Sequence, residues 1–188
     1  KFLPSAAGLL LEKEVAVLGK IGTHPAKPLV VVVGGTKVGD KASFLKAISK
    51  HADAILLGNL ISKEVQGRGI DLAGQTELVY ATDGADGDFD LGPETIKIFR
   101  EKIVGAKTVF WVGPLGKIEE ERYEKGSLAI AEAVLQSGAY AVAGGGDLAG
   151  FLGKHKLRDK FAYVSTGGGA MLAFLAGEKL PGLEALGK

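Results

Sequence analysis

The sequence predicts an α/β fold with three αβα layers and a mainly parallel sheet. Several short apolar runs end in glycine, and helical stretches follow most of them. The first run, Leu29 followed by four valines, has no polar alternation, as expected of a parallel strand buried on both faces. A strand, a glycine turn and a helix, repeated along the chain, are typical of a Rossmann-like α/β domain.

The predicted elements follow in order from the N-terminus. A first helix, from Ser5 to about Lys20, is indicated by leucines and valines at helical spacing, and Pro25 and Pro28 end it. A polar helix is expected over about 40–50, and the clearest helical pattern runs over 119–136. The strand-like runs are 29–33, 54–57, 77–80, 108–112, 139–143 and 161–164.

Composition excludes several classes of function. The 188 residues are 46% hydrophobic, which supports one globular domain with a buried core. The net charge of +1 gives no general attraction to nucleic acid or to a membrane. The absence of cysteine excludes disulfides, thiol chemistry and thiolate metal sites, and no apolar run reaches about 18 residues. Because the chain begins with lysine and shows no signal peptide, we expect a piece of something longer.

Glycine is enriched at the ends of the predicted strands. The chain has 29 glycines, about twice the usual share of ~7%. In an open parallel sheet, ligands bind beyond the carboxyl ends of the strands. A glycine there lets backbone amides face a phosphate, next to the positive end of the following helix. For any one cluster an ordinary strand–helix turn is an equal alternative, but four clusters at the same edge favour an anionic ligand.

The richest cluster is the segment GGTKVGDK at 34–41. If Asp40 caps the following helix, Lys37 lies in the loop and Lys41 in the first turn, so two ammonium groups lie near one helix N-terminus. Two solvated surface lysines are the alternative. A P-loop is not expected, because Asp40 separates Gly39 from Lys41.

A second cluster, at 144–149, matches the weak dinucleotide pattern G-x-G-x-x-A. It comes late in the chain, and Asp159 is a poor candidate for the acid that binds a ribose. Asp147 could cap a helix or bind Mg²⁺, which takes one or two carboxylates together with phosphate oxygens. The spacing alone favours the cap.

Two charged segments are not expected to form sites. Four aspartates, at 83, 86, 88 and 90, resemble a cation loop, but Leu91 and Lys97 break the EF-hand pattern, so a solvated loop is expected. The basic run 154–160 is short and lacks interleaved aromatic residues, so no nucleic-acid partner is expected. Trp111 ends a strand and is assigned to the core.

The motifs taken together resemble phosphoglycerate kinase, and within it the C-terminal, nucleotide-binding domain. The segments that carry the resemblance are KFLPSAAGLLLEKEV, VVVGGTKVGDK, DLGPETI, VFWVGPLGKIEEE, AVAGGGD and VSTGGGAMLAFLAGEKLPGLEAL. The resemblance implies an interdomain-type helix over 1–22 and a nucleotide-binding domain over 23–188. It also implies that the N-terminal domain, which binds 3-phosphoglycerate, is absent. The apolar face of Leu9, Leu10 and Val15 would then be partly uncovered.

The resemblance implies a monomeric, cytoplasmic enzyme of glycolysis with ADP and ATP as substrates. The reaction is Mg²⁺-dependent phosphoryl transfer from 1,3-bisphosphoglycerate to ADP, giving 3-phosphoglycerate and ATP. We expect this chain alone to have no appreciable turnover, since the other half holds 3-phosphoglycerate. The alternative is a diverged nucleotide-binding module without kinase activity, and a Rossmann dehydrogenase is a distant third.

The resemblance also assigns roles to individual residues. Lys41 would neutralise the phosphoryl group in flight, Lys37 would contact a phosphate, and Glu119 would hold the ribose hydroxyls. Asp147 would bind the metal–nucleotide complex, in place of the capping role. The amides of Gly145, Gly146, Gly168 and Gly169 would face the phosphates, Gly146 and Gly169 being catalytic with the two lysines. Further nucleotide contacts are expected from Gly34, Gly35, Thr36, Gly58, Gly92, Pro114, Leu115 and Leu148, most of them in the adenine pocket.

The sequence also departs from the family pattern. Val112 replaces an asparagine, Leu148 replaces a serine or threonine, and Met171 replaces a serine. The glycine run after the second strand is reduced to Leu57-Gly58-Asn59, and the stretch from Ile61 to Phe89 is much shorter than in the family. Two lost polar contacts at roughly 1 kcal/mol each would weaken binding about 30-fold. We therefore expect weakened rather than abolished nucleotide binding.

Overall fold

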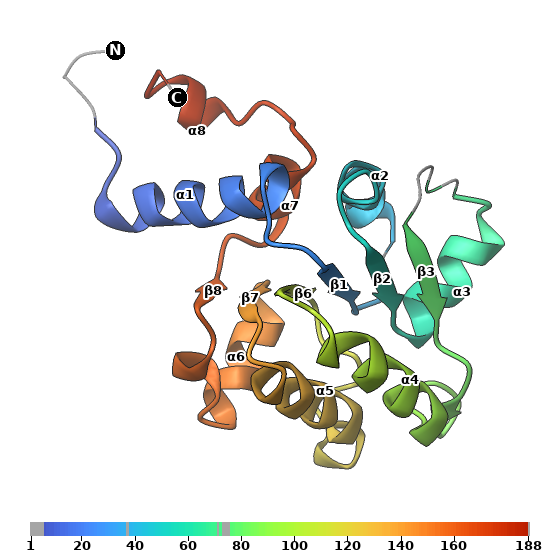
Figure 1. Ribbon diagram of the computed structural model, residues 1–188. Coiled ribbons are helices and arrows are strands. Elements are labelled where there is room, and N and C mark those ends of the chain that lie inside the picture. The colour runs from blue at the N-terminus through green and yellow to red at the C-terminus, as the bar shows by residue number, and fades with distance from the viewer. Residues whose placement is uncertain (1–5, 37, 71, 73–75, 188) are drawn as a thin grey trace.

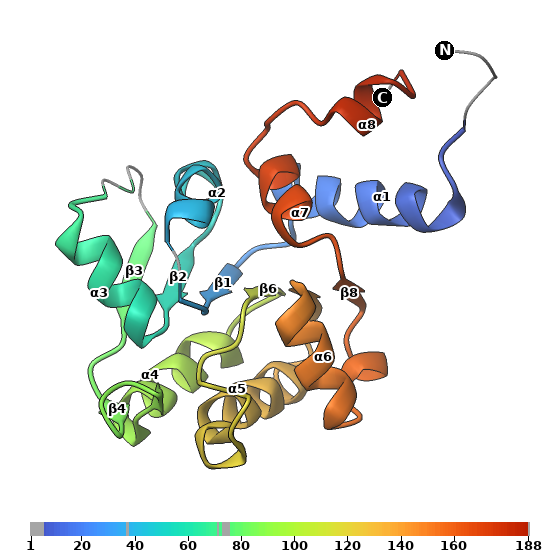
Figure 2. The same ribbon diagram turned by 180° about the vertical axis from the view of Figure 1, so that it is seen from behind.

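The computed structural model describes residues 6–36, 38–70, 72 and 76–187, and it confirms the predicted α/β class. A parallel sheet lies between two layers of helices (Figures 1 and 2). Its strands are β1 (Leu29–Val33), β2 (Ala54–Leu57), β3 (Glu77–Tyr80), β6 (Thr108–Val112), β7 (Tyr140–Gly144) and β8 (Tyr163–Ser165). Their spatial order is β3-β2-β1-β6-β7-β8, and each neighbouring pair is parallel. The order reverses between β1 and β6, the position at which such sheets bind ligands.

Alternation along the buried strands creates two cores, one on each face of the sheet. In β1, Val31 and Val33 point to one face, and Val30 and Val32 point to the other. The first face is covered by α1 (Leu9–Thr23), α2 (Ala42–Ile48), α3 (Asn59–Gly67) and α7 (Gly168–Leu175). The second is covered by α4 (Pro93–Val104), α5 (Lys125–Gln136) and α6 (Gly146–Lys154). Trp111 is fully buried in the second core, as predicted.

The remaining elements are short. They are the antiparallel pair β4 (Gly84–Ala85) and β5 (Asp90–Leu91), the 3₁₀ turns η1 (Gly39–Lys41), η2 (Glu121–Tyr123) and η3 (Arg158–Lys160), and α8 (Pro181–Glu184). None of the helices in the described part of the chain is long and apolar enough to cross a membrane.

Every predicted strand is present to within two residues, but the bounds of the predicted helices need correction. The helix expected over 40–50 is divided into η1 and α2. The helix expected over 119–136 begins only at Lys125. The buried carboxylate of Glu124 holds the preceding turn, because it accepts hydrogen bonds from Lys154 Nζ at 2.8 Å and pairs with His155 Nε2 at 2.9 Å. Burial acts to raise the pKa of Glu124, yet these two partners outweigh it and lower that pKa.

The four aspartates of the expected solvated loop have different environments, and for Asp90 the expectation is wrong. Asp90 is 1% exposed and accepts hydrogen bonds from the amides of Leu91 and Gly126, each at 2.9 Å. Burial raises its pKa, although the amides and Lys125 oppose this. The carboxylate therefore joins β5 to the start of α5, 36 residues later in the chain.

Asp83 caps α4 from outside the helix. Its carboxylate accepts hydrogen bonds from the amides of Glu94 at 3.1 Å and Thr95 at 2.8 Å, and from Thr95 Oγ1 at 2.6 Å. Partial burial acts to raise the pKa of Asp83, but these hydrogen bonds lower it overall. Asp83 thus satisfies two of the orphan amides at the helix start.

The first turn of α1 is apolar and exposed, as expected. Leu9 is 85% exposed and Leu10 is 73% exposed, whereas Val15 is half-buried. Further along the helix, Leu18 and Ile21 are buried in the first core. The helix begins at Leu9 rather than at Ser5, which lies outside the described residues.

Candidate functional site

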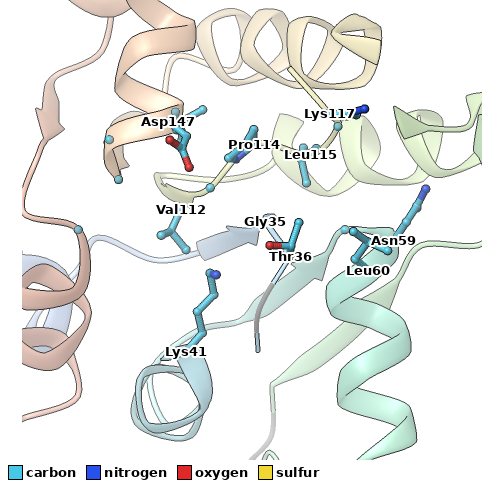
Figure 3. A pocket seen from close by; sticks show the side chains of 18 of the residues that line it. Gly35, Thr36, Lys41, Asn59, Leu60, Val112, Pro114, Leu115, Lys117 and Asp147 are labelled. Carbon is cyan, nitrogen blue, oxygen red and sulfur yellow. The ribbon is translucent and has the colours of Figure 1, made fainter. Parts of the chain in front are cut away.

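A cavity of about 810 Å³ lies at the carboxyl edge of the sheet. Its lining includes residues that end or directly follow four of the strands, namely Gly34, Gly58, Val112 and Gly145, and also Gly168, three residues after the end of β8. It therefore spans the point between β1 and β6 at which the strand order reverses. Figure 3 shows the side chains that converge on it.

The structure brings most of the predicted site residues together around this cavity. Those that line it are Gly34, Gly35, Thr36, Lys41, Gly58, Pro114, Leu115, Glu119, Gly145, Gly146, Asp147, Leu148, Gly168 and Gly169. Lys37 lies outside the described residues. Gly92 does not line the cavity. It is the N-cap of α4, and a Cβ built on it would lie 2.2 Å from Asp83 Oδ2, so the capping carboxylate explains this glycine.

The floor of the cavity is formed by two turns in close contact. The amide of Gly34 donates to Val112 O at 2.8 Å, and the amide of Gly35 donates to Pro114 O at 2.7 Å. A Cβ built on Gly34 would lie 2.0 Å from Pro114 O, so no side chain fits there. Gly35 adopts φ +92°, which favours glycine. The turns after β1 and β6 thus leave flat backbone facing the cavity.

Two helix N-termini meet the cavity at one end. Gly146, Asp147 and Leu148 form the first turn of α6, and Gly168 and Gly169 begin α7. Amides in the first turn of a helix have no acceptor within the helix, and they carry its positive dipole end. The two helices have 9 and 8 residues, enough to form complete turns. This end of the cavity is therefore suited to an anion.

Lys41 adds a positive charge at the same end. It closes the η1 turn, and its side chain extends into the cavity toward Val112 and Gly35 (Figure 3). The ammonium nitrogen lies 3.3 Å from a Cβ built on Gly35. Among the residues that the structure describes, Lys41 and Lys117 are the cations that line the cavity. The side chain of Asp40, expected to cap the helix here, lies outside the described part of the chain.

Asp147 and Leu148 are neighbours at the start of α6, but their side chains have different environments. Asp147 is not the N-cap of α6, a position occupied by Gly145 at φ +105°. Asp147 is instead the second helical residue, exposed, with its carboxylate directed into the cavity (Figure 3). Leu148 is fully buried in the second core. Its side chain packs against the sheet, so only its backbone is available to a ligand.

Glu119 lines the cavity from a turn rather than from a helix. It precedes η2 and is exposed to solvent. Glu119 therefore does not lie in the first turn of a helix, since α5 begins six residues later. Its carboxylate is available to a polar ligand.

Several lining residues were not predicted from the sequence. Leu60 and Phe89 are 42% and 48% exposed, and both line the cavity together with Asn59 and Lys117. In Figure 3, Leu60 lies across the cavity from Asp147. Phe89 is held in place because its carbonyl accepts a hydrogen bond from the amide of Lys117 at 2.7 Å. No local sequence signal marks Phe89, which comes from the glycine-interrupted segment.

Asn59 joins this end of the cavity to β5. Its Nδ2 donates to Asp90 O at 2.8 Å, and the side chain is buried. Its Oδ1 has no hydrogen-bond partner within the described part of the chain. The end of the cavity lined by Leu60 and Phe89 therefore lies next to a buried hydrogen bond between Asn59 and Asp90.

Apolar side chains line the cavity beside the two helix N-termini, at positions that depart from the family pattern. Val112 is buried at the end of β6, and Met171 is buried in the first turns of α7. A Cβ built on Gly144 would lie 2.2 Å from Met171 Sδ, so the methionine fills the space above that glycine. Neither side chain offers a hydrogen bond to an anion.

A half-buried carboxylate connects α1 to β8 and the turn before α7. Glu14 accepts hydrogen bonds from the hydroxyls of Tyr163 and Ser165. Ser165 Oγ in turn accepts a hydrogen bond from the amide of Gly167 at 3.1 Å. Burial, and then the hydrogen bond to Glu14, raise the pKa of Tyr163 to about 12. The network fixes the backbone that leads into Gly168.

Replacing Tyr163 with phenylalanine is expected to remove a pH-dependent part of the stability. The folded state holds the phenol proton more tightly than the unfolded state, whose pKa is 10.0. The stabilisation is therefore complete below pH 10 and is lost as the pH rises through about 12. Urea unfolding gives the free energy of unfolding at pH 9 and at pH 11.5. Between these two pH values, the wild type should lose about 1–2 kcal/mol more of that free energy than Tyr163→Phe. Tyr140→Phe is the matched control, and equal losses in wild type and Tyr163→Phe would contradict the assignment.

The end of the cavity at the two helix N-termini fits a magnesium ion held partly by phosphate. Asp147 contributes a carboxylate there. Within the described ranges no three His, Asp or Glu side chains gather to form a metal site of protein ligands alone. Mg²⁺ is commonly bound by one or two carboxylates together with substrate phosphates and waters. A single carboxylate beside two helix N-termini matches that mode.

Comparison with known proteins identifies the same family throughout. A family model described as phosphoglycerate kinase matches residues 1–71 and 60–178. The phosphoglycerate kinase of Mycoplasmoides gallisepticum is 35% identical over an alignment of 231 positions, gaps included. The alignment covers 97% of this chain and 56% of the relative. That of Thermosipho africanus is 36% identical over 234 residues, 99% of this chain and 58% of the relative.

Solved structures agree with the sequence matches. Phosphoglycerate kinase from Coxiella burnetii superposes with a TM-score of 0.83 at 32% identity, over 96% of this chain and 58% of that one. The enzyme from Pyrococcus horikoshii superposes with a TM-score of 0.82 at 26% identity, over 96% and 56%. This chain thus spans little more than half the length of the relatives it matches.

The comparisons also locate a difference in length. The alignments run over 231 and 234 positions, more than the 188 residues of the chain, so the relatives carry residues that this chain lacks. The two stretches matched by the family model meet at 60–71. This is the start of the segment that the sequence indicates to be shortened.

Proposed function

This chain belongs to the phosphoglycerate kinase family, and we propose that it forms the nucleotide-binding half of such an enzyme. In this proposal residues 1–22 form an interdomain-type helix and residues 23–188 form the nucleotide-binding domain. The other half would hold 3-phosphoglycerate, so the chain alone would have no appreciable turnover. The reaction proposed for the complete enzyme is phosphoryl transfer between 1,3-bisphosphoglycerate and ADP, giving 3-phosphoglycerate and ATP.

The observation that supports this proposal is the division of the cavity into two ends. One end presents two helix N-termini, the Lys41 ammonium and the Asp147 carboxylate. The other end presents Leu60 and Phe89 beside flat glycine backbone. A nucleotide has the matching division, since its base is planar and largely apolar and its phosphates are anionic.

Phosphoryl transfer requires positioning and charge neutralisation rather than covalent catalysis. We propose that the ammonium of Lys41 neutralises the phosphoryl oxygens during transfer, together with the amides of Gly146 and Gly169. These donors are fixed before the reaction, so they do not have to reorganise as the charge moves. Lys37, from the same loop, is proposed as a further phosphate contact.

The remaining residues would orient the nucleotide. Glu119 is proposed to accept hydrogen bonds from the ribose hydroxyls, and Gly35 and Leu115 to pack against the base. Asp147 would hold Mg²⁺, which supplies charge neutralisation on the ADP phosphates when it is bound. The same fixed geometry would keep the terminal oxygen of ADP in line with the phosphoryl donor.

A diverged nucleotide-binding module is the second candidate, and a specific observation favours it. Val112 and Met171 place apolar side chains beside the anion-binding end, and the Leu148 side chain is turned into the core. Binding there would then depend on backbone amides and Lys41. This predicts weaker nucleotide binding than a site with polar side chains at these three positions.

Replacing Asp147 with alanine is expected to remove the effect of magnesium on ADP binding. In the wild type, calorimetric titration should show ADP binding about tenfold more tightly with Mg²⁺ than with a chelator, a difference of about 1.4 kcal/mol. In Asp147→Ala the two dissociation constants should agree within about twofold, since the carboxylate that would hold the ion is gone. Asp159→Ala, an exposed acid outside the cavity, should behave as wild type. A full magnesium effect in Asp147→Ala would overturn the proposed metal site.

A further inference from the structure

The segment that carries Lys41 is anchored by a carboxylate from a different element of the fold. Glu64 lies on α3, and its Oε2 accepts a hydrogen bond from the amide of Val38 at 2.8 Å. Val38 is fully buried, and its carbonyl accepts a hydrogen bond from the amide of Lys41 at 2.8 Å. Glu64 therefore holds the residue from which the Lys41 turn is built.

The segment is rich in glycine. The stretch from Gly34 to Lys41 contains three glycines, which give the backbone little intrinsic rigidity. Its first two residues are fixed by hydrogen bonds to the turn after β6. At the other end, the Val38 amide donates to an ionised acceptor, and such charge-assisted hydrogen bonds are among the stronger ones.

Arg68 lies beside this contact, one helical turn along α3. Its Nη2 is 3.9 Å from Glu64 Oε2, and its Nη1 is 4.0 Å from a Cβ built on Gly39. The ion pair is long, and the arginine side chain is 58% exposed, so it contributes little by itself. Neither Glu64 nor Arg68 lines the cavity.

We propose that Glu64 is a positioning residue that sets where the Lys41 ammonium stands. This inference rests on the proposed function, in which the Lys41 ammonium neutralises phosphoryl oxygens at this end of the cavity. Without the carboxylate, the Val38 amide loses its acceptor and the η1 turn gains freedom. Lys41 then occupies its place in the cavity for a smaller fraction of the time, and the affinity for a terminal phosphate falls.

The test compares two nucleotides in matched variants of the 188-residue chain by calorimetry. Glu64→Ala should weaken MgADP binding by about fivefold to tenfold, and it should change AMP binding by less than about twofold, because AMP lacks the terminal phosphate. Glu64→Gln keeps an acceptor oxygen and should restore most of the MgADP affinity. Arg68→Ala, and Glu132→Ala on the exposed side of α5, should both behave as wild type.

A double variant shows whether Glu64 acts through Lys41. On a Lys41→Ala background, Glu64→Ala should cause no further loss of MgADP affinity. Equal losses for MgADP and AMP, or an additive loss in the double variant, would overturn the inference.

Amide hydrogen exchange separates this inference from the proposed function. Glu64→Ala should speed the exchange of the Val38 and Lys41 amides by at least about tenfold, whether or not Lys41 binds a phosphate. Unchanged exchange at both amides would overturn the anchoring role of Glu64. Faster exchange combined with unchanged MgADP affinity in Lys41→Ala would instead overturn the proposed role of Lys41, and with it the positioning role of Glu64.

Discussion

Replacing Lys41 with alanine is expected to weaken MgADP binding by about 10- to 100-fold. The ammonium group reaches into the cavity at the end where α6 and α7 begin, and it lies 3.3 Å from a Cβ built on Gly35. Hydrogen bonds to charged groups contribute roughly 1.5–3 kcal/mol, which corresponds to an effect of this size. Val112 and Met171 offer no replacement donor nearby.

Calorimetry on the wild type and the variant measures this effect directly. Lys46→Ala is the matched control, because Lys46 is an exposed lysine on α2 that does not line the cavity. The control should bind MgADP within about twofold of the wild type. If Lys41→Ala also bound within that range, Lys41 would not contact the ADP phosphates, and its proposed place at the phosphate end of the cavity would be wrong.

The second large effect is expected from adding a single methyl group to Gly34. A Cβ at this position would lie 2.0 Å from Pro114 O and 2.6 Å from the carbonyl carbon of the same residue. The obstacle is backbone, so the two turns must separate, and the hydrogen bonds from Gly34 and Gly35 to the turn after β6 must stretch or break. We expect Gly34→Ala to lower the free energy of unfolding by about 3 kcal/mol or more, and to weaken MgADP binding as the floor opens.

Gly150→Ala provides a control of opposite sign. Gly150 lies inside α6, is exposed, and a Cβ built on it would have no neighbouring atom within 4 Å. Alanine there should raise the free energy of unfolding by about 0.5–1 kcal/mol, because glycine is costly within a helix. Urea unfolding of the two variants should therefore shift in opposite directions. A Gly34→Ala variant as stable as the wild type would contradict the close contact of the two turns.

The strands and their glycine turns could be predicted because their signal is local. A run such as Leu29–Val33 is buried on both faces and shows this in its composition. The glycine that follows marks the carboxyl end, and in a parallel sheet all such ends share one edge. The position of the cavity follows from these two facts, and so do most of its lining residues.

The errors come from contacts between residues far apart in the sequence. Asp90 bonds the amide of Gly126, and Glu124 bonds Lys154 and His155, and no local pattern reveals either contact. These contacts explain why the acidic loop is not simply solvated and why α5 begins at Lys125. Burial of a carboxylate is also contrary to what its charge alone predicts.

Two site residues were predicted from the family resemblance alone, which does not reveal what surrounds them in this chain. Leu148 keeps the position of a hydroxyl residue, but its own side chain is apolar and joins the second core. Gly92 is held beside the Asp83 carboxylate rather than beside the cavity. Phe89, by contrast, had no motif to mark it, and only the fold brings it to the cavity.

The central claim is that the cavity at the carboxyl edge binds a magnesium nucleotide with its phosphates at the two helix N-termini. The most direct measurement is a titration of the ¹⁵N-labelled chain with MgADP, followed by the shifts of its amide resonances. Saturable shifts should concentrate at Gly35, Gly146, Asp147, Gly168 and Gly169, while the amides around Ile96 and Arg100 on the far side of α4 stay unchanged. An absence of shifts at millimolar MgADP, or shifts confined to residues outside the cavity, would contradict the claim.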